Sequence, residues 1–118
     1  MLALPPSVRI LCATAPTDMR RSFDGLAMLV REVLREDPFS GHLFLFRSRS
    51  GDRVKLLYWD GGGLCLFYKR LEKGTFAFPH VDGNSAVIEA GQLALLLEGI
   101  DFEKIDRPER FVPKRSSP

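Results

Sequence analysis

Residues 37–74, DPFSGHLFLFRSRSGDRVKLLYWDGGGLCLFYKRLEKG, contain the densest apolar pattern of the chain and its most basic loop. Two short runs in this stretch, residues 42–47 and 53–59, are rich in aromatic and branched side chains, which favour strands. The link between them contains Ser50-Gly51-Asp52, and glycine adopts a positive φ without steric cost. The stretch therefore predicts a β-hairpin, around which we expect the rest of the domain to be organised.

A turn and an amphipathic segment follow the hairpin. Asp60 precedes three glycines, which indicate a turn and not a phosphate-binding loop, because no Gly-Lys-Ser/Thr follows them. The next apolar residues recur at helical spacing and are Leu64, Phe67, Tyr68 and Leu71. This spacing, with Gly74 as a terminating residue, predicts a helix over residues 64–73. A strand over residues 64–68 is the alternative.

Two elements are predicted before the hairpin. Residues 8–13 (VRILCA) form an apolar strand candidate after two prolines. Ser22 then precedes a helix that runs to residue 35 and ends before Asp37-Pro38, because a residue before proline disfavours helical conformation. The apolar face of this helix consists of Phe23, Leu26, Ala27, Val30, Val33 and Leu34. We expect this face and that of the 64–73 helix to be buried against the sheet.

The C-terminal part of the chain predicts shorter elements. Residues 75–78 and 86–89 are strand candidates, and residues 91–98 are a leucine-rich helix closed by a glycine. Residues 103–118 form a charged, proline-bearing tail that we expect to be mobile or to dock only in a complex. The prediction is a single α+β domain over residues 1–102. It consists of a small antiparallel sheet around the central hairpin with two to three helices packed on it.

Composition excludes some classes of protein. The chain has 118 residues, of which 45% are hydrophobic and 27% charged, as in ordinary globular domains. Its start lacks a signal peptide or a membrane span, so we expect a cytoplasmic protein without membrane partners. Cys12 and Cys65 lie in apolar surroundings without zinc-site spacing, which predicts two reduced thiols and no metal or cofactor.

The residue types used in catalysis have simpler structural explanations. Enzymes that use two metal ions hold them with carboxylates, and the candidates by residue type are Asp18, Asp24, Asp60 and Glu72. These acids fall in turns, in a first helical turn or on a charged helix face. The histidines at 42 and 80 have no partnered nucleophile, and the serines at 22, 40 and 50 lie in turns and caps. The sequence therefore predicts neither an enzyme nor a small-molecule substrate.

The charge distribution indicates one candidate binding surface. Net charge is only +2, but residues 40–73 contain seven bases and three acids. We call these bases the basic edge; they are Arg47, Arg49, Arg53, Lys55, Lys69, Arg70 and Lys73. Such a surface contacts phosphates with little base specificity, although a solvated charged surface is an equal alternative. Arg20-Arg21 either joins this surface or caps a carboxylate.

Aromatic side chains offer a second kind of contact. Tyr58 and Trp59 are adjacent in a predicted strand, so their side chains should point to opposite faces. Together with Phe67 they could stack on bases, but aromatic residues more often serve as core or interface anchors. We therefore take Tyr58 and Trp59 as candidate contacts with a protein partner.

Three segments together resemble a known family: residues 17–27 (TDMRRSFDGLA), residues 37–76 and residues 92–101 (QLALLLEGID). The chain resembles the TnpB accessory proteins of insertion-sequence 66 family elements over about residues 8–102. It does not resemble the RNA-guided nuclease that shares the name TnpB. The resemblance implies a bacterial protein encoded beside a DDE-type transposase, with a part in transposition and no catalytic residues to carry over.

Two hypotheses follow for the mechanism. In the first, a non-enzymatic accessory factor contacts DNA without sequence specificity through the basic edge, next to the transposase. In the second, the protein is an adaptor that docks on the transposase without contacting DNA.

Overall fold

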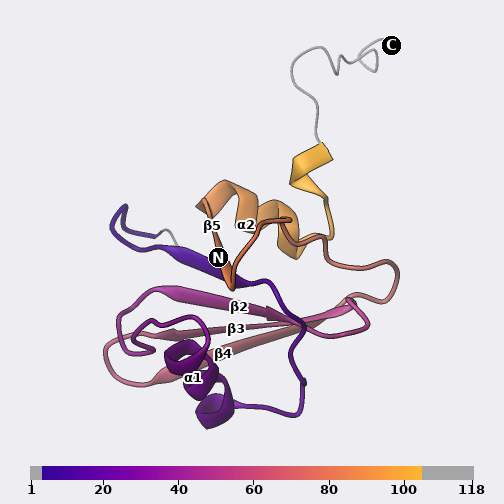
Figure 1. The fold of residues 1–118 in the computed structure, drawn as a ribbon. Coiled ribbons are helices and arrows are strands. Elements are labelled where there is room, and N and C mark those ends of the chain that lie inside the picture. The colour runs from indigo at the N-terminus through magenta and orange to yellow at the C-terminus, as the bar shows by residue number, and fades with distance from the viewer. Residues whose placement is uncertain (1–3, 105–118) are drawn as a thin grey trace, which may run out of the picture.

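The computed structural model describes residues 4–104, which form a five-stranded sheet with helices on both faces (Figure 1). In chain order the elements are β1 (Ile10–Ala13), α1 (Phe23–Glu32), β2 (Leu43–Arg47), β3 (Arg53–Trp59), β4 (Leu64–Arg70), β5 (Ser85–Ile88) and α2 (Ala90–Leu97). A short 3-10 helix, η1 (Phe102–Lys104), follows α2. The predicted α+β class is confirmed. Within residues 4–104, no helix is long and apolar enough to cross a membrane.

The sheet is mixed, whereas the sequence predicts an antiparallel sheet, so this part of the prediction was wrong. Its strand order is β4-β3-β2-β1-β5, with β1 and β2 parallel and every other neighbouring pair antiparallel. The parallel pair arises because the chain leaves β1, passes through α1 and returns to the same end of the sheet. Parallel neighbours need such a crossover connection.

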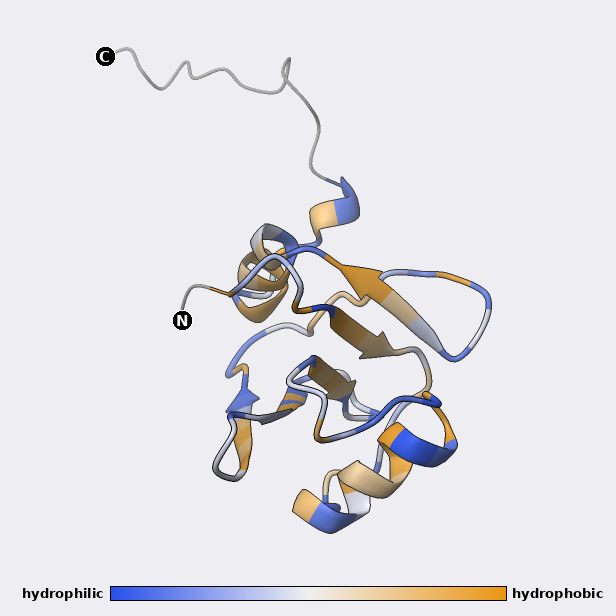
Figure 2. Ribbon diagram, turned by 90° about the vertical axis from the view of Figure 1, so that its left-hand side faces the viewer, coloured by the Kyte–Doolittle hydropathy of each residue, from blue (hydrophilic) through white to orange (hydrophobic). Residues whose placement is uncertain are grey.

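Each face of the sheet is covered by one helix, and Figure 2 shows the two helices on opposite sides of the strands. The buried residues on the α1 face are Leu11, Ala13, Leu26, Ala27, Val30, Leu34, Phe44, Phe46 and Leu57. Those on the α2 face are Ile10, Cys12, Leu43, Leu45, Val54, Leu56, Phe76, Phe78, Ile88, Leu93 and Leu96. Since both faces of the central strands are buried, their sequences are nearly continuously apolar.

The segment predicted as a helix over residues 64–73 is a strand, so that prediction was wrong. β4 pairs with β3 along its whole length, from Arg53 opposite Arg70 to Trp59 opposite Leu64. The reason lies in the turn, where one carboxylate oxygen of Asp60 accepts the N–H groups of Gly62 and Gly63 at 2.9 Å. This turn returns the chain beside β3, and strand pairing then outweighs the helical spacing of the side chains.

Burial of the first helix follows the prediction only in part. Leu26, Val30 and Leu34 are buried, as expected. Phe23 is 43% exposed, because it lies at the first position of α1, and Val33 is 38% exposed because the helix ends at Glu32. In the segment predicted as a second helix, the expected burial is also incomplete: Phe67 is 42% exposed, and Leu64 and Leu71 are half-buried.

The C-terminal part of the chain follows the predictions only in part. Residues 75–78 form no strand, but Phe76 and Phe78 are buried under the sheet. The strand and the helix expected over residues 86–98 are present as β5 and α2. Of the predicted tail, residues 103 and 104 belong to η1, and residues 105–118 lie outside the described part of the chain.

Candidate nucleic-acid interface

The loop between β2 and β3 is held by its own hydrogen bonds. Ser48, which is buried, accepts the N–H groups of Gly51 and Arg53 through its hydroxyl oxygen, both at 3.1 Å. Ser50 donates its hydroxyl to Asp52 at 2.6 Å, and this bond is the main cause that lowers the pKa of Asp52. Gly51 has a φ of +84°, which glycine adopts readily. The loop therefore presents Arg49 and Arg53 from a defined conformation.

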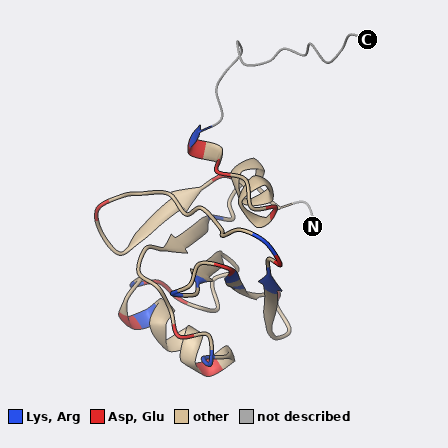
Figure 3. Cartoon of the chain, turned by 90° about the vertical axis from the view of Figure 1, so that its right-hand side faces the viewer, with Lys and Arg blue, Asp and Glu red and all other residues tan. Residues whose placement is uncertain are grey.

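The basic edge divides between the two faces of the sheet. Side chains alternate along a strand, so Arg53 and Lys55 point to the α1 face. Their partners on β4, Arg70 and Tyr68, point to the same face. Arg47 pairs with Val54 and points to the α2 face, as does Lys69. Figure 3 shows that the strands and loops beside α1 carry most Lys and Arg, while β5 and α2 carry none. The basic edge is therefore not one continuous surface.

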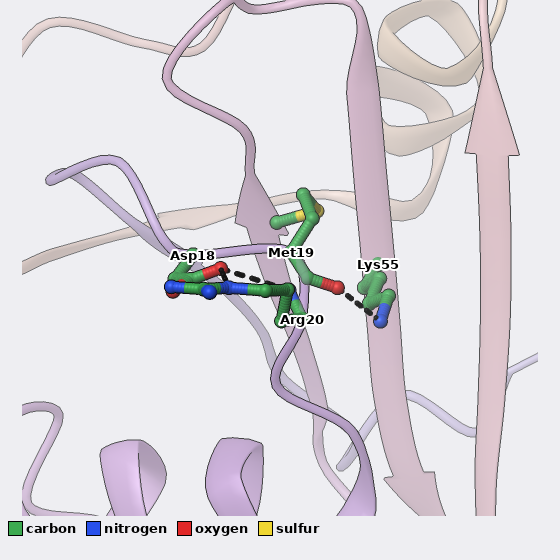
Figure 4. Close-up of polar contacts among 4 residues, drawn as sticks. All are labelled: Asp18, Met19, Arg20 and Lys55. Carbon is green, nitrogen blue, oxygen red and sulfur yellow. Dashed lines mark hydrogen bonds and ion pairs between the residues drawn. The ribbon is translucent and has the colours of Figure 1, made fainter.

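Lys55 is buried and serves the fold. Its ammonium donates hydrogen bonds of 2.8 Å to the carbonyl oxygens of Met19 and Arg21, the first of which is drawn in Figure 4. The same nitrogen lies 4.6 Å from the centre of the Tyr68 ring, in a cation–π contact. Lys55 thus ties the segment before α1 to the sheet, and its charge is not presented to solvent.

Three other members of the basic edge also have partners within the fold. Arg47 donates to the carbonyl oxygen of Thr14 at 2.9 Å and lies over the ring of Phe78. Lys69 donates to the carbonyl oxygen of Leu97 at 2.7 Å, at the C-terminal end of α2, where the helix dipole favours a cation. Arg70 forms a 3.0 Å salt bridge with Glu72 on the surface.

Arg49 and Arg53, the remaining arginines of the basic edge, meet Arg20 at an open cleft of about 760 Å³, which we call the arginine cleft. It lies between the segment before α1 and the β2–β3 loop. Its lining residues are Pro16, Thr17, Asp18, Met19, Arg20, Ser48, Arg49, Ser50 and Arg53. Among the described residues, no acid forms a salt bridge with Arg49 or Arg53. Three arginines and one aspartate give the cleft a formal charge of +2.

Asp18 and Arg20 form an ion pair at the edge of the arginine cleft. The two side chains approach to 2.7 Å, and Asp18 also accepts the backbone N–H of Arg20 at 2.9 Å (Figure 4). The side-chain hydrogen bond from Arg20 is the main cause that lowers the pKa of Asp18 to about 2. Arg20 therefore fulfils both sequence-based alternatives, since it caps a carboxylate and also lines the cleft with basic-edge residues.

The candidate catalytic side chains are dispersed and have structural partners. Asp24 lies in the first turn of α1, Asp60 holds the β3–β4 turn, and Glu72 pairs with Arg70. His42 accepts the backbone N–H of Arg9 through Nδ1. In residues 4–104, no three His, Cys, Asp or Glu residues are grouped so that they could hold a metal ion. Of the thiols, Cys12 is buried and Cys65 is half-buried.

Tyr58 and Trp59 point to opposite faces, as predicted. Tyr58 packs against the buried residues of the α2 face. Trp59 makes an edge-to-face contact with Phe39, with ring centroids 5.2 Å apart. Phe39 is 45% exposed and also lies under the guanidinium of Arg31. Sequence reasoning missed Phe39. Its place directly after the Asp37-Pro38 helix stop was visible, but nothing in the local sequence indicated its contact with Trp59.

Comparison with known proteins places this fold in a family. Residues 8–107 match the family described as "IS66 Orf2 like protein". The chain belongs to this family. The match confirms the resemblance to the TnpB proteins of insertion-sequence 66 elements and makes the chain a transposition-associated accessory protein.

Relatives of similar length occur in Sinorhizobium fredii. The "Uncharacterized protein y4hO" is 47% identical over 102 residues, which cover 86% of this chain and 89% of the relative. The "Uncharacterized protein y4jC" is 38% identical over 107 residues, which cover 91% of this chain and 92% of the relative. No solved structure matches the chain.

Proposed function

We propose that this IS66 Orf2-like protein acts in transposition by contacting DNA phosphates through the arginine cleft, next to the DDE-type transposase of its element. The observation that carries the proposal is the convergence of Arg20, Arg49 and Arg53 on one open cleft that contains a single acid. Arg49 and Arg53 form no salt bridge with the described acids. Their guanidinium groups are therefore available to an external anion.

The chemistry of the cleft suits a phosphate backbone. A guanidinium group donates two parallel hydrogen bonds to phosphate oxygens, which an ammonium group cannot do with the same geometry. Phosphate contacts carry no base information, so binding should be independent of DNA sequence. With a formal charge of +2 on the cleft, we expect modest affinity that falls as salt rises.

The proposal assigns no reaction to the protein. Each acid considered as catalytic has a structural hydrogen bond, a salt bridge or a place in a helical turn. The DNA contact would thus position the element's ends or stabilise the complex, while the transposase carries out strand cleavage and joining.

The test replaces Arg20, Arg49 and Arg53 together by glutamine and measures binding to a labelled DNA duplex by fluorescence anisotropy at low salt. The matched control replaces Arg31, Arg35 and Lys104 by glutamine, three exposed bases outside the cleft, with the same change in net charge. We expect the cleft variant to lose at least tenfold in affinity and the control to lose much less. Equal losses would show that only net charge matters and would refute the cleft.

The adaptor function is a second candidate, supported by the exposed Phe39 beside Trp59. Exposed aromatic residues next to an arginine are common anchors of protein interfaces. If the protein docks through this pair, Phe39→Ala with Trp59→Ala should abolish co-purification with the transposase, whereas the cleft variant should retain it. Retention by the aromatic variant and loss by the cleft variant in DNA-free samples would contradict this second candidate.

A further inference from the structure

β4 is an edge strand whose outer backbone groups have no partner among the described elements (Figure 1). The hydrogen bonds that flank its ladder with β3 run from Leu71 N–H to the Asp52 carbonyl and from Asp60 N–H to the Gly63 carbonyl. In an antiparallel pair, hydrogen-bonded residues alternate along each strand. Residues 65, 67 and 69 therefore bond to β3, while the N–H and C=O groups of residues 64, 66, 68 and 70 point outward.

Most of this edge lacks the usual protection against strand pairing, since its charged residues, Lys69 and Arg70, lie at its C-terminal end. Edge strands are typically short, or carry lysine, proline, bulges or inward-pointing charges. β4 has seven residues, contains no proline, and carries no charge before Lys69. Phe67 and Tyr68, at its centre, are 42% and 49% exposed. The other edge strand, β5, has only four residues.

We propose that β4 pairs with β4 of a second copy of this chain, antiparallel and about a two-fold axis at Phe67. The outward groups belong to even-numbered residues, so a symmetric pairing must join even to even. A two-fold axis at Phe67 satisfies this rule, because it places Leu66 opposite Tyr68 and Leu64 opposite Arg70 of the other copy. Homodimers with such self-complementary interfaces are the commonest oligomers.

Side chains in this register are compatible with the pairing. Phe67 would lie opposite Phe67 in a non-hydrogen-bonded position, where side chains are closest and aromatic pairs are favourable. The basic residues of the two copies lie at opposite ends of the paired β4 strands, with Arg70 opposite Leu64. The two Arg70 side chains would be six residues apart along the strands, roughly 20 Å, so like charges do not meet. The aromatic pair at the axis and the separation of the basic residues favour a second copy of β4 as the partner strand.

The two-fold axis is perpendicular to the sheet. The dimer would therefore place both copies of α1 on one side of a ten-stranded sheet. The two arginine clefts would then lie on the same face, toward opposite ends of the joint. If the proposed function holds, one dimer could contact two segments of DNA. This last consequence rests on the proposed function, whereas the dimer itself does not.

The test measures mass by sedimentation equilibrium without DNA, so that failure of the dimer and failure of the DNA contact are separate results. Phe67→Glu and Phe67→Lys each place like charges opposite one another across the axis, and Phe67 is exposed enough for the monomer to remain folded. We expect wild-type protein to have the mass of two chains and each variant that of one. An equimolar mixture of the two variants should recover the dimer.

Val87→Glu is the matched control, because it introduces the same charge at an exposed position on the opposite edge strand. It should remain a dimer. Wild-type protein with the mass of one chain at all concentrations would overturn the proposal. So would a dimer that survives Phe67→Glu, a mixture that stays monomeric, or a Val87→Glu variant that dissociates.

Discussion

Replacing Lys55 by methionine tests whether this buried base holds the fold together. Methionine keeps most of the apolar length of the side chain but removes the ammonium group that donates to the carbonyl oxygens of Met19 and Arg21. A hydrogen bond to a charged group contributes about 1.5–3 kcal/mol, and a buried carbonyl that loses its donor costs about 1–3 kcal/mol. The recovered desolvation cost of the ammonium offsets part of this loss.

The net expectation is a decrease of about 2–4 kcal/mol in the free energy of unfolding. For a domain of this size the melting temperature should fall by roughly 10 °C. Urea titration followed by circular dichroism measures the difference, with Lys73→Met as the control because Lys73 is exposed. The control should change stability by less than about 0.5 kcal/mol. If Lys55→Met is no less stable than the control, Lys55 does not hold the segment before α1 to the sheet.

Further predictions concern charge, ionisation and packing. Asp18→Asn keeps the side-chain oxygen that accepts the Arg20 N–H but removes the negative charge of the carboxylate. Duplex DNA should therefore bind more tightly, as measured by fluorescence anisotropy. Unchanged or weaker binding would argue against the cleft. Burial raises the pKa of the Cys12 thiol to about 12 from its ordinary value of 9.0, so the folded state favours the neutral thiol. Its contribution to stability should be complete below pH 9 and decline by about 1.4 kcal/mol per pH unit between pH 9 and about pH 12. Urea titrations of Cys12→Ala should lack this dependence. Leu26→Ala should cost about 2–5 kcal/mol, whereas Phe23→Ala, at the exposed start of α1, should cost far less; equal costs would contradict the packing of α1.

The elements that sequence reasoning predicted well are those governed by local chemistry. The central hairpin follows from two apolar runs around Ser50-Gly51-Asp52, and the observed strands begin and end within one residue of the predicted ones. The first helix is also present, though it ends earlier than its apolar spacing suggests. In both cases turn or helix-ending residues bracket a clear periodic pattern.

The failure at β4 has a physical cause. Leu64, Phe67 and Leu71 are spaced as on a helix, but the turn at Asp60 delivers this segment to the open edge of β3. Pairing with an existing strand is a tertiary interaction that local spacing does not contain. Gly74, which the helix prediction uses as a terminating residue, instead lies in a bend after β4 with a φ of +85°.

The arginine cleft could be predicted only in part. The sequence identifies the bases of the hairpin loop as candidate contacts, with Arg20 as a possible addition. Arg20 reaches these bases because Lys55 on β3 binds the carbonyl oxygens of Met19 and Arg21, which lie 36 and 34 residues earlier in the chain. One signal for its burial was present, because strand alternation places Lys55 on the same face as the apolar Leu57. Charge counting along the sequence could not distinguish this buried base from its exposed neighbours.

The salt dependence of DNA binding tests the central claim most directly. The slope of log K against log salt counts the phosphate contacts, at about one unit for each contact. We predict that the variant with Arg20, Arg49 and Arg53 replaced by glutamine has a slope smaller by two to three units than wild type, for every duplex tested. The control variant at Arg31, Arg35 and Lys104 should keep the wild-type slope. Identical slopes for the wild-type and cleft variant would show that the arginine cleft does not contact DNA.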